Sequence, residues 1–224
     1  MRNQNLPQKP RERTRKRPLA RLLTKSDAAS TGVLTYKNLH FPAALGAGGI
    51  RARKNEGDGA TPLGAWACVK VYYRPDRVRR PQTTLHAEPL RACMGWCDAP
   101  NDRNYNRKVT LPYAASAETL WRDDPLYDVI VVLDYNLMPR SRGRGSAIFL
   151  HVARLSLSPT EGCIAIKRQH LLRLLHVLSP GAAVAPGKTL AISADCAAGS
   201  SKGRSRAFRG PVLWRRSLPH ASVG

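Results

Sequence analysis

The middle of the chain consists of short apolar runs separated by polar turns, which is the pattern of β-strands. Residues 33–36 alternate apolar and polar side chains, Lys37 and Asn38 follow as a turn, and residues 39–45 form a second apolar run. This order predicts a β-hairpin with Lys37 and Asn38 at its tip. Other short runs of the same kind predict strands at residues 65–73, 127–133, 147–150, 164–166 and 182–192.

One segment departs from the strand pattern. Between residues 167 and 178, leucines recur at positions 171, 172, 174, 175 and 178, and this spacing predicts an amphipathic helix with one apolar face. Six or seven strands with a single helix indicate a mainly β domain that a helix covers. We expect this domain to span residues 31–196.

Two stretches have no regular period. Residues 46–64 are rich in glycine, which favours a loop. Residues 74–126 form a long insertion whose pattern fits neither helix nor strand. Because a structureless segment of this length is unusual inside a compact domain, the insertion is predicted to be a functional lid or a substrate platform.

Positive charge is concentrated at the two ends of the chain. The whole chain has a net charge of +22, and residues 1–25 and 197–224 together carry +14 of it. Residues 1–30 and 197–224 are therefore predicted to be basic, disordered segments. Such segments stay solvated or contact an anionic polymer or a membrane surface. Basicity alone does not indicate a specific nucleic-acid partner.

The sequence has no apolar run of about 18 residues, so no transmembrane helix is predicted. Its basic start is not followed by the apolar region of a standard secretion signal. The expected location is the periplasm or cell envelope if the protein is exported by another route, and the cytoplasm otherwise. We expect a monomer.

A histidine and a cysteine in the second half of the chain carry the strongest chemical signal. His151 follows the predicted strand at residues 147–150, and Gly162 and Cys163 lie at a turn before the next strand. This layout can bring an imidazole and a thiol together, as in a Cys–His nucleophile. Gly162 would let the turn expose the sulfur and direct backbone N–H groups at an oxyanion. The alternative is an inert buried thiol.

The motif around these residues resembles the L,D-transpeptidase catalytic-domain family. Its core in this chain is SAIFLHVA followed by SPTEGCIAI, which contains His151 and the run Thr160-Glu161-Gly162-Cys163. The loop EGDGATPLG, which contains Thr61, is similar to the substrate-side loop of the family. The segments GWCDAPNDRNYN and LWRDDPLYDVIVVLDYN are similar to a bacterial branch of it. The resemblance extends over about residues 32–192.

The resemblance implies a β-sandwich fold and a thiol mechanism that needs no cofactor. Cys163 would be the nucleophile, and His151 would be the general base and later the acid, oriented by the main-chain carbonyl of Val152. The N–H groups at Gly162 and Cys163 would stabilise the oxyanion. On the substrate side we expect contacts from Thr160, Glu161 and Thr61.

Two positions depart from the family pattern. Glu161 stands where the family has a second histidine, and Ala165 stands where it commonly has an arginine. Substrate recognition is therefore expected to differ. The candidates to replace the missing guanidinium are Arg154, which we place among the substrate-binding residues, Lys167 and Arg168. The simpler alternative is that these side chains are only solvated.

In the family, the cysteine attacks the carbonyl of the third residue of a peptidoglycan stem peptide, expels the terminal D-alanine, and passes the acyl group to an amine of a second stem. This chain is therefore predicted to be a transpeptidase that acts in cell-wall cross-linking or remodelling. The nearest alternative is a Cys amidase or carboxypeptidase that hands the same thioester to water. The other is a non-catalytic basic binding protein in which Cys163 is inert.

Other groups give weaker signals. Cys93 and Cys97, with His86 upstream, would supply half of a zinc site, but a second pair is missing and free thiols are the simpler interpretation. We therefore predict no metal site. Aromatic residues of the insertion either line a substrate groove or form a small core of their own. They are Trp96, Tyr105, Tyr113 and Trp121.

Overall fold

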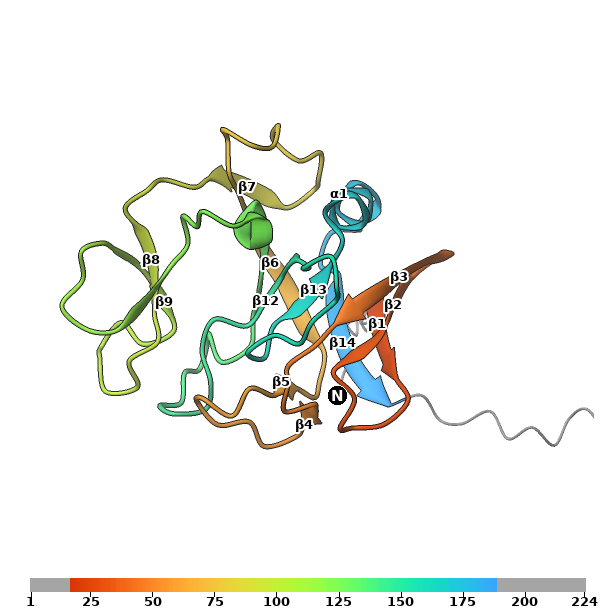
Figure 1. Ribbon diagram of the computed structural model, residues 1–224, viewed down its shortest axis with the longest axis horizontal. Helices are drawn as coiled ribbons and strands as arrows, with labels where there is room; N and C mark the ends of the chain where they lie inside the picture. Colours follow the sequence, from red (N-terminus) through yellow and green to blue (C-terminus); the bar gives the residue numbers. More distant parts are fainter. Residues whose placement is uncertain (1–16, 189–224) are drawn as a thin grey trace, which may run out of the picture. The chain divides into compact units, whose positions relative to one another are not determined.

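The computed structural model describes residues 17–188 of the chain. Over this range the chain forms strands, one short 3-10 helix (η1) and one α-helix (Figure 1). Their bounds are β1 (Leu19–Thr24), β2 (Thr31–Tyr36), β3 (Leu39–Ala44), β4 (Ile50–Arg51), β5 (Thr61–Pro62), β6 (Trp66–Tyr73), β7 (His86–Pro89), β8 (Met94–Cys97), β9 (Arg107–Thr110), β10 (Ala117–Thr119), η1 (Pro125–Tyr127), β11 (Val129–Leu133), β12 (Phe149–Val152), β13 (Ile164–Ile166), α1 (Arg168–Val177) and β14 (Ala183–Lys188). The prediction of a mainly β domain with one helix is therefore confirmed for the described residues.

Nine strands form one sheet in the order β11-β12-β13-β3-β2-β1-β14-β6-β7. Strand β11 also pairs with β6. Each of the first eight strands in this order is therefore hydrogen-bonded to a neighbouring strand on both sides. Most neighbours are antiparallel, whereas β1–β14, β12–β13 and β6–β7 are parallel. The two layers of a sandwich stay a prediction, because the pairing itself describes a continuous ladder.

Strand β11 separates two apolar cores. All five of its residues are buried, since the run VIVVL is apolar at both alternate sets of positions. One set faces the main core and the other faces a second core that includes residues of the insertion. In the neighbouring strand β12, Leu150 and Val152 join the main core and Phe149 joins the second. His151 is therefore on the same side as Phe149, toward the insertion.

The helix α1 packs against the main core through one face. Leu171, Leu174 and Leu175 are buried there, as their spacing requires. The predicted amphipathic helix is therefore confirmed, with its first helical residue at Arg168.

The prediction of disorder for residues 1–30 is wrong for part of that segment. Residues 19–24 form β1, which pairs with β2 on one side and with β14 on the other. Its alternate residues Ala20, Leu22 and Thr24 are buried, so the apolar period of the strand outweighs the basic composition around it. Residues 25–30 are described as well and connect β1 to β2, whereas residues 1–16 and 197–224 of the predicted tails lie outside the described residues.

The insertion has its own secondary structure, although its sequence shows little period. Strand β7 extends the large sheet beside β6, and β10, β8 and β9 form a separate three-stranded sheet. Trp96 of β8 is buried and packs edge-on against Phe149 of β12, with ring centroids 5.2 Å apart. Tyr105 is buried as well, whereas Tyr113 and Trp121 are half-buried. Trp96, with Trp121 packed against the same cluster, thus contributes to the second core, which joins the insertion to the sheet.

Candidate active site

The turn that carries Cys163 requires glycine at position 162. Gly162 has a φ of +125°, and a Cβ at this position would lie only 2.7 Å from the carbonyl oxygen of Ala60. The turn leaves the Cys163 side chain 8% exposed. The Phe149 N–H donates to Sγ at 3.3 Å, and the thiol donates to the Ala147 carbonyl at 3.1 Å. The sulfur is therefore held in place against strand β12.

The hydroxyl groups of Thr61 and Thr160 hold this turn in place through hydrogen bonds to its backbone. The Thr61 hydroxyl accepts from the Gly46 N–H at 2.9 Å and donates to the Gly162 carbonyl at 3.0 Å. The Thr160 hydroxyl donates to the Cys163 carbonyl at 2.6 Å. Thr61 has no exposed surface, so its contacts support the geometry of the turn.

A buried cation lies beside the same turn. The side chain of Lys54 is 3% exposed, and its Nζ lies 2.7 Å from Oδ1 of Asp58. The Lys54 Nζ is 3.3 Å from the position that a Cβ on Gly162 would take. Lys54 could not be predicted as a buried residue, because a single lysine in a glycine-rich loop gives no sign of burial in the sequence.

His151 has the orientation that the resemblance implies. Its Nδ1 lies 2.9 Å from the carbonyl oxygen of Val152, and because a carbonyl only accepts, Nδ1 carries the proton and Nε2 is left as the base. The Tyr127 ring packs edge-on against the imidazole, with centroids 5.3 Å apart. Burial lowers the pKa of His151 to about 4, against the opposing effect of the carbonyls of Val152 and Leu126.

The thiol and the imidazole are both neutral at pH 7 in this environment. Burial, together with the charge of Glu118, raises the pKa of Cys163 to about 12, against the opposing effects of the Phe149 N–H and the charge of Lys54. A reactive thiolate would therefore require transfer of the thiol proton to a neighbouring base.

His151 and Cys163 open into one cavity of about 420 Å³. Thr160, Glu161 and Arg154 also line it, so the structure brings these three predicted substrate residues together with the predicted catalytic pair. Thr61 and Gly162 are not part of the lining. The remaining lining residues are Glu56, Asp98, Glu118, Arg122, Leu126, Tyr127, Ser146 and Ala147.

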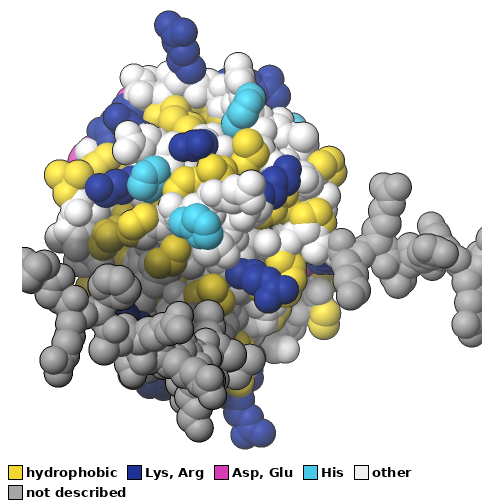
Figure 2. Space-filling view, turned by 90° about the vertical axis from the view of Figure 1, so that its right-hand side faces the viewer, with side chains coloured by type: hydrophobic (Ala, Val, Ile, Leu, Met, Phe, Trp, Pro, Cys, Tyr) yellow, Lys and Arg dark blue, Asp and Glu magenta, His cyan; other side chains and the backbone are white. Residues whose placement is uncertain are grey.

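The cavity is acidic although the protein is basic. Four carboxylates line it against two guanidinium groups. The outer face shown in Figure 2, by contrast, displays scattered Lys and Arg side chains and very little Asp or Glu. The cavity is thus suited to attract a cationic group.

The insertion supplies one wall of the cavity. The individual residues of this wall could not be predicted from the sequence. The Tyr127 hydroxyl donates to Oε1 of Glu118 at 2.6 Å. Burial raises the pKa of Glu118. Arg122 is bound to Asp124 through two hydrogen bonds of 2.9 and 2.7 Å. No periodic signal in the sequence marks these positions.

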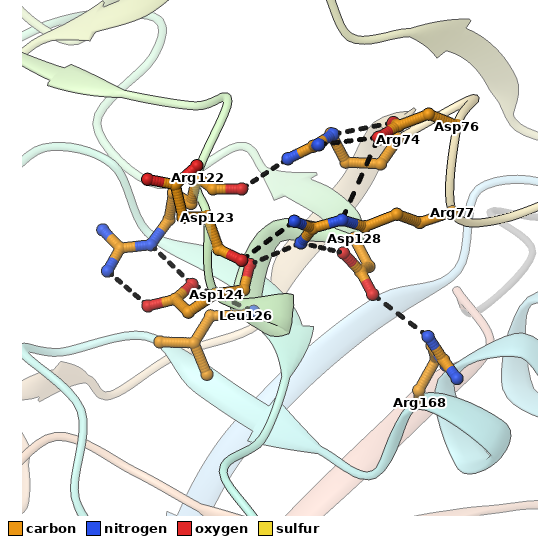
Figure 3. A network of polar contacts seen from close by, with 9 residues as sticks. All are labelled: Arg74, Asp76, Arg77, Arg122, Asp123, Asp124, Leu126, Asp128 and Arg168. Atoms are coloured by element: carbon orange, nitrogen blue, oxygen red, sulfur yellow. Dashed lines mark hydrogen bonds and ion pairs between the residues drawn. The ribbon is translucent and has the colours of Figure 1, made fainter.

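A network of ion pairs anchors this wall to the sheet and to α1 (Figure 3). Asp128 is 1% exposed and accepts from Arg77 at 3.2 Å and from Arg168 at 3.1 Å. Arg77 also donates to the carbonyls of Asp123 and Asp124. Arg168, one of the three candidates for the missing guanidinium, is therefore bound to Asp128. It lines a separate cavity together with Lys167.

Metal ligands do not cluster in the described part of the chain. No group of three or more His, Cys, Asp or Glu side chains there could hold an ion. The four cysteines of residues 17–188, which are Cys68, Cys93, Cys97 and Cys163, are free thiols. Within the same range, no helix has the length and apolar character needed to cross a bilayer.

Comparison with known proteins adds one finding. The profile of the L,D-transpeptidase catalytic domain matches residues 29–185. No curated protein and no solved structure matches the chain significantly. Since the matched range covers most of the chain and contains both His151 and Cys163, this protein belongs to the L,D-transpeptidase catalytic-domain family.

Proposed function

We propose that this protein is a cysteine acyltransferase that cuts and rejoins peptidoglycan stem peptides through a thioester. The observation that carries the proposal is the shared cavity of Cys163 and His151, in which the Val152 carbonyl orients the imidazole through Nδ1. The family supplies the substrate class.

The first step is acylation. As Sγ of Cys163 attacks the donor carbonyl, its proton moves to Nε2 of His151. The N–H groups at Gly162 and Cys163 stabilise the oxyanion. The N–H of Gly162 makes only a long bond of 3.3 Å to Thr160, which is easily exchanged for a stronger acceptor. His151 then protonates the leaving amine, and D-alanine departs.

The second step is transfer. An amine attacks the thioester, and the proton that it loses returns through His151 to the departing sulfur. Arg154 and Glu161 are exposed at the cavity, and we assign them to the polar groups of the peptide. Because these substrates lie in the cell envelope, the proposed function requires that the protein acts there.

Intact mass spectrometry with a carbapenem tests the nucleophile. We expect a single adduct on the native chain and none on Cys163→Ala, while both proteins show the same circular dichroism. Release of D-alanine from a stem tetrapeptide then tests the substrate. A folded native chain that gains no adduct would favour the alternative of a non-catalytic basic binding protein. That alternative also predicts salt-dependent binding to anionic polymer that survives Cys163→Ala.

A further inference from the structure

A carboxyl–phenol pair lies beside the thiol–imidazole pair. Glu118 and Tyr127 both line the catalytic cavity and are joined by a hydrogen bond of 2.6 Å. The Tyr127 ring is the one that packs against His151. Tyr127 is 6% exposed, and burial raises its pKa well above the usual value, so its hydroxyl stays protonated and continues to donate to Glu118. The mechanism described above gives this pair no role.

Transfer to an amine requires one more base than transfer to water. An alkyl amine with a pKa of about 10 enters the site as an ammonium ion, which has no lone pair. It must lose one proton before it attacks and a second one as the new amide forms. His151 handles only the second proton, because it must return that proton to Sγ of Cys163. A water molecule needs no such preliminary step.

We propose that Glu118, held by the Tyr127 hydroxyl, binds the ammonium group of the acyl acceptor and takes its first proton, and thereby directs the thioester to aminolysis. This inference rests on the proposed acyl-transfer function. The step is balanced: the ammonium proton moves to the Glu118 carboxylate, the free amine forms the C–N bond, and the C–S bond breaks. The second nitrogen proton reaches Sγ through His151, and Glu118 finally releases its proton to solvent.

The charges around Glu118 suit this role. Arg122 and Tyr127 stabilise its charged form, whereas Asp98 and burial oppose it, and burial dominates. The pKa of Glu118 is therefore raised, which makes the carboxylate a stronger base than an exposed glutamate. The Arg122 guanidinium is bound to Asp124, so Glu118 remains available to a cation from the cavity.

The experiment compares Glu118→Gln with the native enzyme on a stem-tetrapeptide donor, with transfer and hydrolysis products quantified by mass spectrometry. Two acceptors are used at pH 7: an alkyl amine, which is an ammonium ion, and methoxyamine, which is already a free base. Asp123→Asn is the control, because it changes a carboxyl to an amide at an exposed position outside the cavity lining. Carbapenem acylation reports separately on the Cys163 nucleophile.

We expect Glu118→Gln to lower transfer to the alkyl amine by at least about tenfold, within the usual range of general-base effects. Transfer to methoxyamine and hydrolysis should stay within about twofold of the native rates. Carbapenem acylation should not fall, because loss of the Glu118 charge lowers the pKa of Cys163. Tyr127→Phe, which keeps the ring against His151, should lower alkyl-amine transfer by a smaller factor. Equal losses with both acceptors, or no loss with the alkyl amine, would overturn the role of Glu118. Absence of acylation in the native enzyme would instead overturn the proposed function, and this inference with it.

Discussion

The two walls of the catalytic cavity are built in different ways. The wall that carries Cys163 uses residues 46–62 and 160–163, and backbone groups and threonine hydroxyls hold it. The wall at residues 118–127 consists of the end of the insertion together with Tyr127, and it presents charged side chains that ion pairs and hydrogen bonds hold in place. If the proposed function holds, the first wall would hold the nucleophile and the second would mainly select what reaches the thioester, while the charge of Glu118 also raises the pKa of Cys163. Changes in the two walls should therefore affect different steps.

The largest effect is expected on the nucleophile side, from His151→Gln. Without the imidazole no group accepts the Cys163 proton, and burial disfavours the bare thiolate. We expect acylation by a carbapenem to slow by about 10²–10⁴-fold, as measured by the rate of adduct formation in intact mass spectra. Unchanged acylation in a folded variant would show that another group activates the thiol.

Comparison of the native protein with His151→Gln also measures how much His151 contributes to the pH dependence of the free energy of unfolding. Burial lowers the folded-state pKa of His151 from 6.5 to about 4. Between these values the unfolded chain binds a proton at this residue and the folded chain does not, so falling pH destabilises the fold. From pH 7 to pH 4 the native protein should lose about 3 kcal/mol of unfolding free energy relative to His151→Gln. Urea denaturation of both proteins at each pH measures the difference, and parallel curves would contradict the burial effect.

Gly162→Ala should damage the first wall through the backbone. The residue would have to keep a φ of +125° with its Cβ 2.7 Å from the Ala60 carbonyl oxygen. We expect a loss of about 2 kcal/mol in the free energy of unfolding, together with slow acylation, because the turn must shift. Gly57→Ala provides a control: Gly57 also has a positive φ of +74°, but a Cβ there meets nothing within 4 Å. Equal losses in the two variants would mean that the contact with Ala60 is unimportant.

The two walls also differ in how far the sequence could predict them. Short local patterns were sufficient for the strands β11 and β12 and for the helix α1, whereas the pairing of His151 with Cys163 was expected mainly from the resemblance to the family. The positions of Glu118 and Arg122 could not be read in the same way. Ion pairs between distant segments, such as that of Asp128 with Arg77, fix their wall, and such pairs leave no period in the sequence. Strand β1 was missed for a different reason, since basic residues hid its alternating apolar positions.

Asp128→Asn should loosen the second wall. Asp128 is buried and pairs with Arg77 and Arg168, whose side chains are 31% and 53% exposed, so solvent weakens both pairs. We expect a loss of about 1–2 kcal/mol in the free energy of unfolding, measured by urea denaturation. Acylation should change by less than about threefold, while the ratio of transfer to hydrolysis should fall. A fall in acylation as large as the fall in transfer would contradict the separation of the two walls.

The smallest effect is expected from Arg154→Ala, at the mouth of the cavity. Arg154 is exposed and lines the cavity, so solvent screens its attraction for a donor carboxylate. We expect the KM for the stem tetrapeptide to rise by about threefold with little change in kcat, because binding of the donor and of the transition state should weaken equally. Arg142→Ala is the matched control, since Arg142 is exposed and outside the cavity lining.

If KM rises only in Arg154→Ala, this arginine recognises the donor and partly replaces the guanidinium that is missing at position 165. If neither variant changes KM, recognition of the donor depends on uncharged groups of the first wall, such as the backbone near Thr160.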